Sequence, residues 1–472
     1  MTHQSKSASM VTRRKFLALT GGMTVAGLVA ACGTAPAPAD TGEAGSTGSE
    51  AATELIAWFT DRRTINEMTE QEAIPDFESR NPNIRVSLQF VPESELQQKL
   101  LTANAAGNAP DVSSIDETFL DTLTKQEVLR PIPDEVVNVS EEMGELTAFL
   151  YRLPQGADDG RYYGLPNGVF SAALYYNAGL LEELGYAPED IPSRWDDFIL
   201  WAKEVTEWDG ETLVRGGLGI FANEFSIYED LRYQLAGPID GNPFPTKDSI
   251  RLADEVGVQA WEFIMDIYNE HRLDSIAEGI ISRDRFGAGN AVTLYNWTWF
   301  NGQMDTQYPE IDWGILVPPS INDEPPFGRR GPDVGFTLTT QNDAMLDAAI
   351  TFYRYLLSPD YLSKYCKLRG IQPSLRTMWD DPEFSEESGP RWAAVAIKNR
   401  PENSIDTGFW PLELVDITNR LTPAIRDEGE DITTVLQREE QAGNEYLNAN
   451  PQWSILSAAD YEANPQWLTV VG

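Results

Sequence analysis

The segment 293–299, which reads Thr-Leu-Tyr-Asn-Trp-Thr-Trp, carries a dense group of side chains with distinctive chemistry. Side chains two positions apart on a β-strand point to the same face. Trp297 and Trp299 would therefore hold two indole rings side by side if this segment is a strand. Such a pair either forms a platform on which a ligand stacks or packs in the core between a sheet and a helix.

Groups that serve catalysis or cofactor binding are scarce. The chain has two histidines, His3 and His271, and two cysteines, Cys32 and Cys366. No Gly-Lys pair, H-E-x-x-H or G-x-S-x-G occurs, and Val292 stands where a G-x-G-x-x-G would need its third glycine. With 74 acidic residues, paired carboxylates arise by chance and carry almost no weight as evidence for a glycosidase. The sequence predicts a protein that is not an enzyme and needs no cofactor or metal.

Residues 1–32 have the pattern of an export signal. Arg13 and Arg14 precede a weakly apolar run over residues 16–31, which is shorter than the about 20 residues that cross a bilayer core. The paired arginines resemble a twin-arginine signal, and Leu28-Val-Ala-Ala-Cys32 resembles a lipobox, in which the cysteine is acylated. We expect Cys32 to anchor an extracytoplasmic protein to the cell membrane; the alternative is a signal peptide with a chance cysteine.

Composition sets the organisation of the remaining chain. Residues 33–53 contain no large apolar side chain, which predicts a flexible tether. The folded part then starts near Glu54 and, at about 419 residues, exceeds a comfortable single core, so two lobes are expected. The formal charge of −39 becomes −43 when the four cations of residues 1–32 are removed. Such acidity argues against nucleic acid and anionic membrane surfaces as partners.

The elements that would position a site alternate along the chain. Apolar or alternating segments predict strands at 55–59, 84–90 and 111–115, with helices at 65–78 and 94–106 between them. This order is typical of a parallel sheet with covering helices. Ser193-Arg-Trp-Asp196 resembles a capping box before an apolar helical stripe that ends at Val205.

Eight segments, in order over about residues 54–450, resemble family 1 of the extracellular solute-binding proteins of bacterial ABC importers, which includes maltose-binding proteins. They are Gly107-Asn-Ala-Pro-Asp-Val112, Gly164-Leu-Pro166 with Leu174-Tyr-Tyr-Asn177, Pro192-Ser-Arg-Trp195, the segment 286–299, Asp312-Trp-Gly-Ile-Leu-Val-Pro318, the segment 348–358, Gly370-Ile-Gln-Pro373 and Phe409-Trp410. Arg194 departs from the family pattern, in which threonine is common at that position.

The resemblance implies a two-lobe α/β periplasmic-binding-protein fold with a multi-strand hinge and a ligand cleft between the lobes. Mapped onto this sequence, one lobe comprises residues 54–166 plus 318–345, and the other comprises 167–317 plus 346–472. The chain would then cross between the lobes near Pro166, Pro318 and Gln341.

Aromatic residues are the first candidates for the ligand site. The resemblance implies that Trp299 stacks on a sugar ring, because an aromatic face buries the C–H groups of the sugar while its hydroxyls form hydrogen bonds at the edges. Tyr176 and Trp410 match further stacking positions of the family. Trp297 is a weaker candidate, and for it as for Trp299 the alternative is a place in the core.

Polar candidates follow the first and third predicted strands. Trp58 lies at the carboxyl end of the first strand, where open α/β sheets bind ligands. Asp61 and Arg63 follow in the loop, unless that loop is only a solvated turn. Asp116 comes directly after the third strand and could accept two hydroxyls, or instead cap a helix.

These observations predict a non-enzymatic receptor that binds a mono- or oligosaccharide by lobe closure and delivers it to the membrane permease of an ABC importer. The expected form is a lipid-anchored monomer. One alternative within the same fold binds a phosphorylated polyol or another small polar solute, which the Arg62-Arg63 pair permits. Two alternatives from other classes are a surface glycosidase and an adhesin.

Overall fold

The computed structural model describes residues 52–136, 143, 161–220, 224–243, 249–276, 281–321, 328–378, 381–382, 384, 404–406 and 412–450. The predicted signal with Cys32, nearly all of the predicted tether, and Trp410 lie outside these residues. Within the described ranges, no helix is both long enough and apolar enough to cross a membrane.

The first sheet contains five strands in the order β2-β1-β3-β11-β4. β1 (Thr53–Thr60) is parallel to β2 (Ile84–Val91) and β3 (Val112–Ile115), which confirms the three predicted strands and their direction. β11 (Gly335–Leu338) runs antiparallel to β3 and to β4 (Leu165–Pro166). A segment more than 200 positions later in the chain thus completes the sheet that the N-terminal strands begin.

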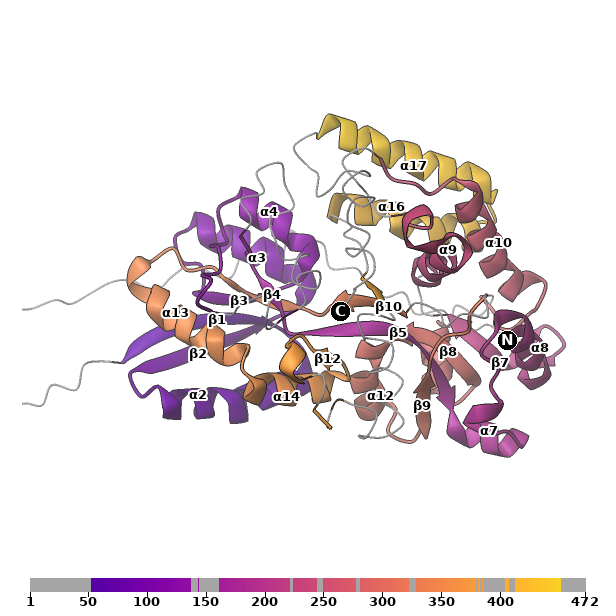
Figure 1. Ribbon diagram of the computed structural model, residues 1–472, viewed down its shortest axis with the longest axis horizontal. Coiled ribbons are helices and arrows are strands. Elements are labelled where there is room, and N and C mark those ends of the chain that lie inside the picture. Colours follow the sequence, from indigo (N-terminus) through magenta and orange to yellow (C-terminus); the bar gives the residue numbers. More distant parts are fainter. Residues whose placement is uncertain are drawn as a thin grey trace, which may run out of the picture. The chain divides into compact units, whose positions relative to one another are not determined.

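Helices cover both faces of this sheet (Figure 1). One face carries α3 (Glu93–Ala105) and α4 (Leu120–Lys125), whose buried leucines pack against Val91 and Ile115. The other face packs the alternate strand residues Leu55, Ala57 and Phe59 against helices on the opposite side of the sheet. Those helices are α1 (Arg63–Met68), α2 (Ile74–Arg80), α13 (Asp343–Leu356) and α14 (Pro359–Arg369).

Two predictions for this part of the chain need correction. The helix expected at 65–78 is α1 and α2 with a π-helical turn, η2 (Thr69–Ala73), between them. The lobe boundary expected at residue 345 would separate α13 and α14 from the first sheet. Instead Phe352 and Tyr353 of α13 are buried in the same core as Phe59, because the apolar stripe of this amphipathic helix faces β1 and β11.

The second sheet is built around the ten-residue strand β5 (Gly168–Asn177). Its strand order is β13-β10-β5-β8-β7-β6, and β9 and β12 also pair with β5. β5 is antiparallel to β8, β9, β10 and β12, while β7 and β8 are parallel. The other strands are β6 (Glu207–Asp209), β7 (Thr212–Ile220), β8 (Ala291–Trp297), β9 (Trp313–Leu316), β10 (Gly328–Pro332), β12 (Gln372–Pro373) and β13 (Ser404–Asp406).

The helix predicted from Trp195 to Val205 is present as α8 (Trp195–Val205), and the residues of its apolar stripe are buried. The predicted capping box is wrong: Arg194 occupies the N-cap and makes no side-chain cap, and the Trp195 N–H donates to the carbonyl of Ser320 instead. The remaining helices are α7 (Ala178–Leu184), α9 (Phe225–Asp240), α10 (Glu255–Asn269), α11 (Ser282–Gly287), α12 (Asn301–Gln307), α16 (Leu412–Thr422) and α17 (Ile432–Ala449).

The chain passes between the two sheets at three described places. β4 leads into β5 through Asn167, β10 leads into β11 through Asp333 and Val334, and α14 leads into β12 through Gly370 and Ile371. The crossing predicted near Pro166 agrees with the first of these. The crossings predicted near Pro318 and Gln341 are instead at 333–334 and 370–371.

Candidate functional site

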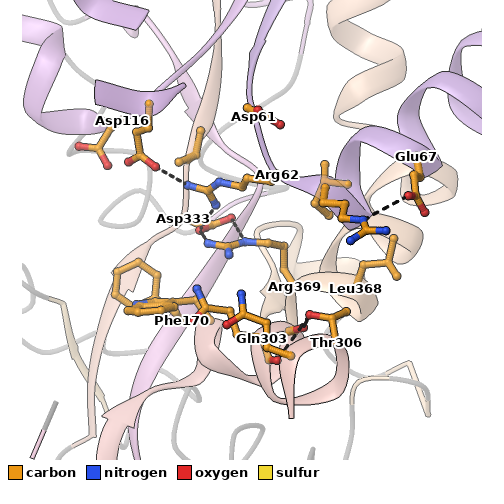
Figure 2. A pocket seen from close by; sticks show the side chains of 17 residues that line it. Asp61, Arg62, Glu67, Asp116, Phe170, Gln303, Thr306, Asp333, Leu368 and Arg369 are labelled. Carbon is orange, nitrogen blue, oxygen red and sulfur yellow. Dashed lines mark hydrogen bonds and ion pairs between the residues drawn. The ribbon is translucent and has the colours of Figure 1, made fainter. Parts of the chain in front are cut away.

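A cavity of about 930 Å³ lies where these crossings meet. Its lining comes from the loop after β1, the residue after β3, the β10–β11 crossing, the end of α14, β5 and the segment from Trp299 to Gln307. Figure 2 shows Asp61, Arg62 and Asp116 toward one side of it and Phe170, Gln303 and Thr306 toward the other, with Asp333 and Arg369 between.

The first wall stands at the carboxyl ends of two neighbouring parallel strands, where ligands of open α/β sheets bind. Asp61 follows β1 and accepts a hydrogen bond of 2.6 Å from the side-chain amide of Asn66. Arg63 also lines the cavity, but its side chain is 92% exposed and pairs at 3.7 Å with Glu67 one helical turn on. Both residues are therefore within reach of solvent and of a ligand in the cavity.

Asp116 follows β3 and lines the same wall. One of its carboxylate oxygens accepts from the backbone N–H and the hydroxyl of Thr118, at 3.0 and 2.6 Å, so the residue does turn the chain into the short helix η3 (Glu117–Phe119). Burial raises the pKa of Asp116, and the charge of nearby Glu93 raises it further. This carboxylate therefore combines a structural hydrogen bond with a place on the cavity wall.

The second wall is aromatic and amide-rich. Phe170 of β5 lines it together with Trp299, which lies in the short helix η5 (Thr298–Phe300) and is partly exposed. Gln303, Thr306 and Gln307 of α12 complete this side. The hydroxyl of Thr306 donates to the carbonyl of Gly302 at 2.7 Å. This wall offers flat apolar surface next to uncharged amides.

An ion network occupies the position between the walls. Asp333 is bound by Arg369 through two contacts, at 2.5 and 3.2 Å, and accepts from the hydroxyl of Tyr365 at 2.7 Å. Arg62 lies 3.6 Å from Asp333 and 3.2 Å from Glu93. The Asp333 N–H donates to the Gly168 carbonyl, which ties two crossings together.

Electrostatics keep this carboxylate charged. Burial alone would raise the pKa of Asp333, but Arg369 and Arg62 outweigh that effect and hold the pKa below its usual value. Burial likewise would lower the pKa of Arg62, but Asp333, Tyr365 and Glu93 together raise it. Asp333 and Arg62 are therefore ionised at neutral pH.

The predicted site residues divide into two groups. Asp61, Arg63, Asp116 and Trp299 line the cavity. Trp58, Tyr176 and Trp297 are not among its lining residues. The Lys99 ammonium lies 4.4 Å from the ring centre of Trp58, on the α3 side of the sheet. Tyr176 is buried where its ring covers Gly314 of β9.

Trp297 closes β8 and is also buried, with its indole N–H donating to the Ser226 hydroxyl at 3.1 Å. For Trp410, which lies outside the described residues, ligand contact stays a prediction. Sequence reasoning missed Phe170, Gln303, Glu93, Asp333 and Arg369 as cavity residues. Asp333 lies in a chain crossing and Arg369 directly precedes one, whereas Glu93 begins α3, Phe170 lies in β5 and Gln303 lies in α12.

Within the described part of the chain, no group of three or more His, Cys, Asp or Glu side chains is placed to hold a metal ion. The thiol of Cys366 is buried, and burial raises its pKa well above the usual value.

Residues 72–390 match the sequence model of the bacterial extracellular solute-binding proteins. The match covers more than half of the chain, and the chain belongs to this family. The arabinooligosaccharide-binding protein of Halalkalibacterium halodurans is 24% identical over 350 residues, which are 72% of this chain and 75% of that protein.

Solved structures share the fold. The cyclic α-maltosyl-1,6-maltose-binding protein of Arthrobacter globiformis matches with a TM-score of 0.66 at 20% identity, covering 84% of this chain and all of that one. UgpB of Mycobacterium tuberculosis, in complex with glycerophosphocholine, matches with a TM-score of 0.69 at 19% identity, covering 84% and 98%. These likenesses establish the α/β periplasmic-binding-protein fold predicted from the sequence.

Proposed function

We propose that this protein is the substrate-binding lipoprotein of an ABC importer, and that it captures a mono- or oligosaccharide in the cavity between the two sheets. The observation that carries the proposal is the pairing of an aromatic wall, Phe170 and Trp299, with polar groups across the cavity. A sugar needs both, because its C–H face stacks on a ring while its hydroxyls need hydrogen-bond partners.

The polar residues suit hydroxyl groups. Asp61 and Asp116 are carboxylates at strand ends, and each already accepts hydrogen bonds through Oδ1. We expect Oδ2 of each to accept hydrogen bonds from ligand hydroxyls. Gln303 and Gln307 supply amides that both donate and accept. Trp299 and these polar groups are the contacts we propose for the ligand, with Arg63 at the entrance. Trp297 would act indirectly, by packing behind Phe170.

The relatives support the substrate class without fixing it. The relative from Halalkalibacterium halodurans is named for arabinooligosaccharides, and the Arthrobacter globiformis structure is named for a cyclic maltosyl-maltose. UgpB holds a phosphodiester instead. A phosphorylated polyol is therefore the second candidate, and the cavity arginines are the feature that would favour it.

The proposed mechanism is closure of the two sheets and their helices over the ligand, by a hinge motion at the crossings. The closed form would then dock on a membrane permease. Export and anchoring would follow from residues 1–32, with the lipid on Cys32 and the binding domain held outside the cytoplasm by the tether.

Isothermal calorimetry with a panel of arabino-, malto- and galacto-oligosaccharides, together with glycerol phosphates, tests the ligand class. We expect saturable binding of at least one neutral saccharide at one site per chain. Binding of glycerol phosphates alone would favour the second candidate, and binding of neither would contradict the proposal. A reducing-sugar assay on the ligand that binds checks for hydrolysis: steady product release would overturn the receptor interpretation.

A further inference from the structure

The three arginines on the cavity wall all have acidic partners within the described residues. Arg63 pairs with Glu67 on its own helix. Arg369 binds Asp333 through both its Nε and an Nη atom. Arg62 lies between Asp333 and Glu93. A bidentate guanidinium–carboxylate pair uses the donor fork that would otherwise hold a phosphate or a carboxylate of a ligand.

Asp333 is the residue on which two of these pairs converge. Its side chain is 3% exposed, and the Tyr365 hydroxyl fixes the oxygen that also faces the Arg369 Nε. It belongs to the β10–β11 crossing, whereas Arg62 follows β1 and Arg369 ends α14. Asp333 therefore holds two guanidinium groups from different elements at one place on the cavity wall (Figure 2).

The charge of the lining points the same way. Five acids, Asp61, Glu67, Glu93, Asp116 and Asp333, face three arginines, which leaves a net charge of −2. An anion would enter this cavity against the field and would have to displace a buried carboxylate to reach Arg369. A neutral ligand meets neither obstacle.

One nitrogen of Arg62 has a hydrogen-bond donor that is not used within the described part of the protein. The Nη1 of Arg62 is buried and makes no hydrogen bond among the described residues, and it lies 3.6 Å from a carboxylate oxygen of Asp333. With Asp333 neutral, this donor and the released fork of Arg369 would face the cavity together. That arrangement is the one by which arginines recognise phosphate.

We propose that Asp333 makes the cavity selective for uncharged ligands, because it holds Arg62 and Arg369 in ion pairs and so keeps both from binding anions. Asp333 is a positioning and selectivity residue in this scheme, and need not touch the ligand. The inference rests on the proposed function in taking this cavity as the ligand site, and it decides between the two ligand classes left open there.

Inorganic phosphate is the probe, because it reports on the arginines without requiring any sugar. Calorimetric titration of the wild-type protein should show no saturable binding at millimolar phosphate. Asp333→Asn should bind phosphate at least about tenfold more tightly than the wild type. The double variant Asp333→Asn with Arg369→Gln should lose most of that gain, which locates the binding at the released arginine.

Asp116→Asn is the matched control. It removes one negative charge from the same cavity but breaks no hydrogen bond to an arginine, since Asp116 accepts its hydrogen bonds from Thr118. Its phosphate affinity should stay well below that of Asp333→Asn. An equal gain in both variants would show that net charge alone governs anion binding, and would overturn the role assigned to Asp333.

Two further results would also overturn the inference: phosphate binding by the wild type as tight as by Asp333→Asn, or no phosphate binding by a cooperatively melting Asp333→Asn. Should that variant fail to fold, Asp333→Ser replaces it, because it also removes the buried carboxylate that binds Arg369 and lies near Arg62. A gain in phosphate affinity at Asp333→Ser supports the inference, and no gain contradicts it. The sugar panel is scored separately, so failure of the carbohydrate proposal leaves this outcome readable.

Discussion

Phe170 stands edge-on against Trp297, with ring centroids 4.9 Å apart and an angle of 81° between the planes. Phe170 lines the cavity and Trp297 does not. The indole of Trp297 is in turn fixed by its hydrogen bond to Ser226. Trp297 thus supports an aromatic wall that Phe170 and Trp299 present, and the two tryptophans have different tasks although they are two positions apart.

The first prediction separates these tasks. Trp299→Ala should weaken binding of the saccharide by roughly 1–3 kcal/mol, the range for an aromatic anchor, because stacking surface is lost. Its melting temperature without ligand should barely change. Trp297→Ala should instead cost about 3–5 kcal/mol of folding free energy, since it leaves a cavity in the core. Calorimetry and thermal melts of both variants measure the two quantities.

The opposite pattern is equally informative. A large loss of stability in Trp299→Ala with affinity intact would mean that this ring is core packing. The two variants serve as controls for each other, because they remove the same side chain from neighbouring positions.

The fold was largely predictable from sequence because it depends on periodicity and order. Three strands and the amphipathic helix from Trp195 follow from apolar spacing alone, and the family segments order the rest. The expected pairing of Trp297 and Trp299 on one strand face failed for a local reason: β8 ends at Trp297, and Trp299 sits in a short helix. Side chains two positions apart share a face only within a strand, so this expectation does not extend past Trp297.

The cavity was predictable only in part. Asp61 and Asp116 are predictable because each directly follows a strand that the sequence reveals, and Arg63 lies in the same short segment after β1. Asp333 and Arg369 lie at chain crossings that depend on which sheet α13 and α14 join, and that choice is made by packing against β1 and β11. No short-range pattern records it.

The second prediction concerns the anchor. Because acylation requires the thiol of Cys32, Cys32→Ala should leave the chain unprocessed or release it from the membrane fraction. Detergent-phase partitioning of cells expressing each form measures this, and unchanged partitioning of the variant would contradict the lipobox interpretation. A chain that begins at residue 53 should still melt cooperatively, because the tether has no apolar surface to bury.

The third prediction concerns pH. The pKa of Asp333 is lower in the folded protein than the value of about 3.9 expected when it is unfolded. The ionised carboxylate therefore stabilises the folded state above that value, and this contribution is lost as the pH falls through the depressed pKa. The free energy of unfolding of the wild type should fall more steeply than that of Asp333→Asn below about pH 4. Urea melts at a series of acidic pH values measure the free energy of unfolding of both proteins. Parallel pH profiles would contradict a stabilising ion pair between Asp333 and Arg369.

The fourth prediction concerns closure. A ligand that binds only the folded state stabilises it by mass action, by about 2.7 kcal/mol at a hundredfold excess over the dissociation constant. The correct saccharide should therefore raise the melting temperature.

If the crossings at Asn167, Asp333–Val334 and Gly370–Ile371 act as a hinge, the same saccharide should also reduce the radius of gyration measured by X-ray scattering of a chain that begins at residue 53. If the aromatic wall is needed only for affinity, the Trp299→Ala variant at saturating ligand should show the same decrease in radius of gyration as the wild type. A ligand that binds tightly and leaves the radius of gyration of the wild type unchanged would rule out hinge closure while leaving the binding site itself intact.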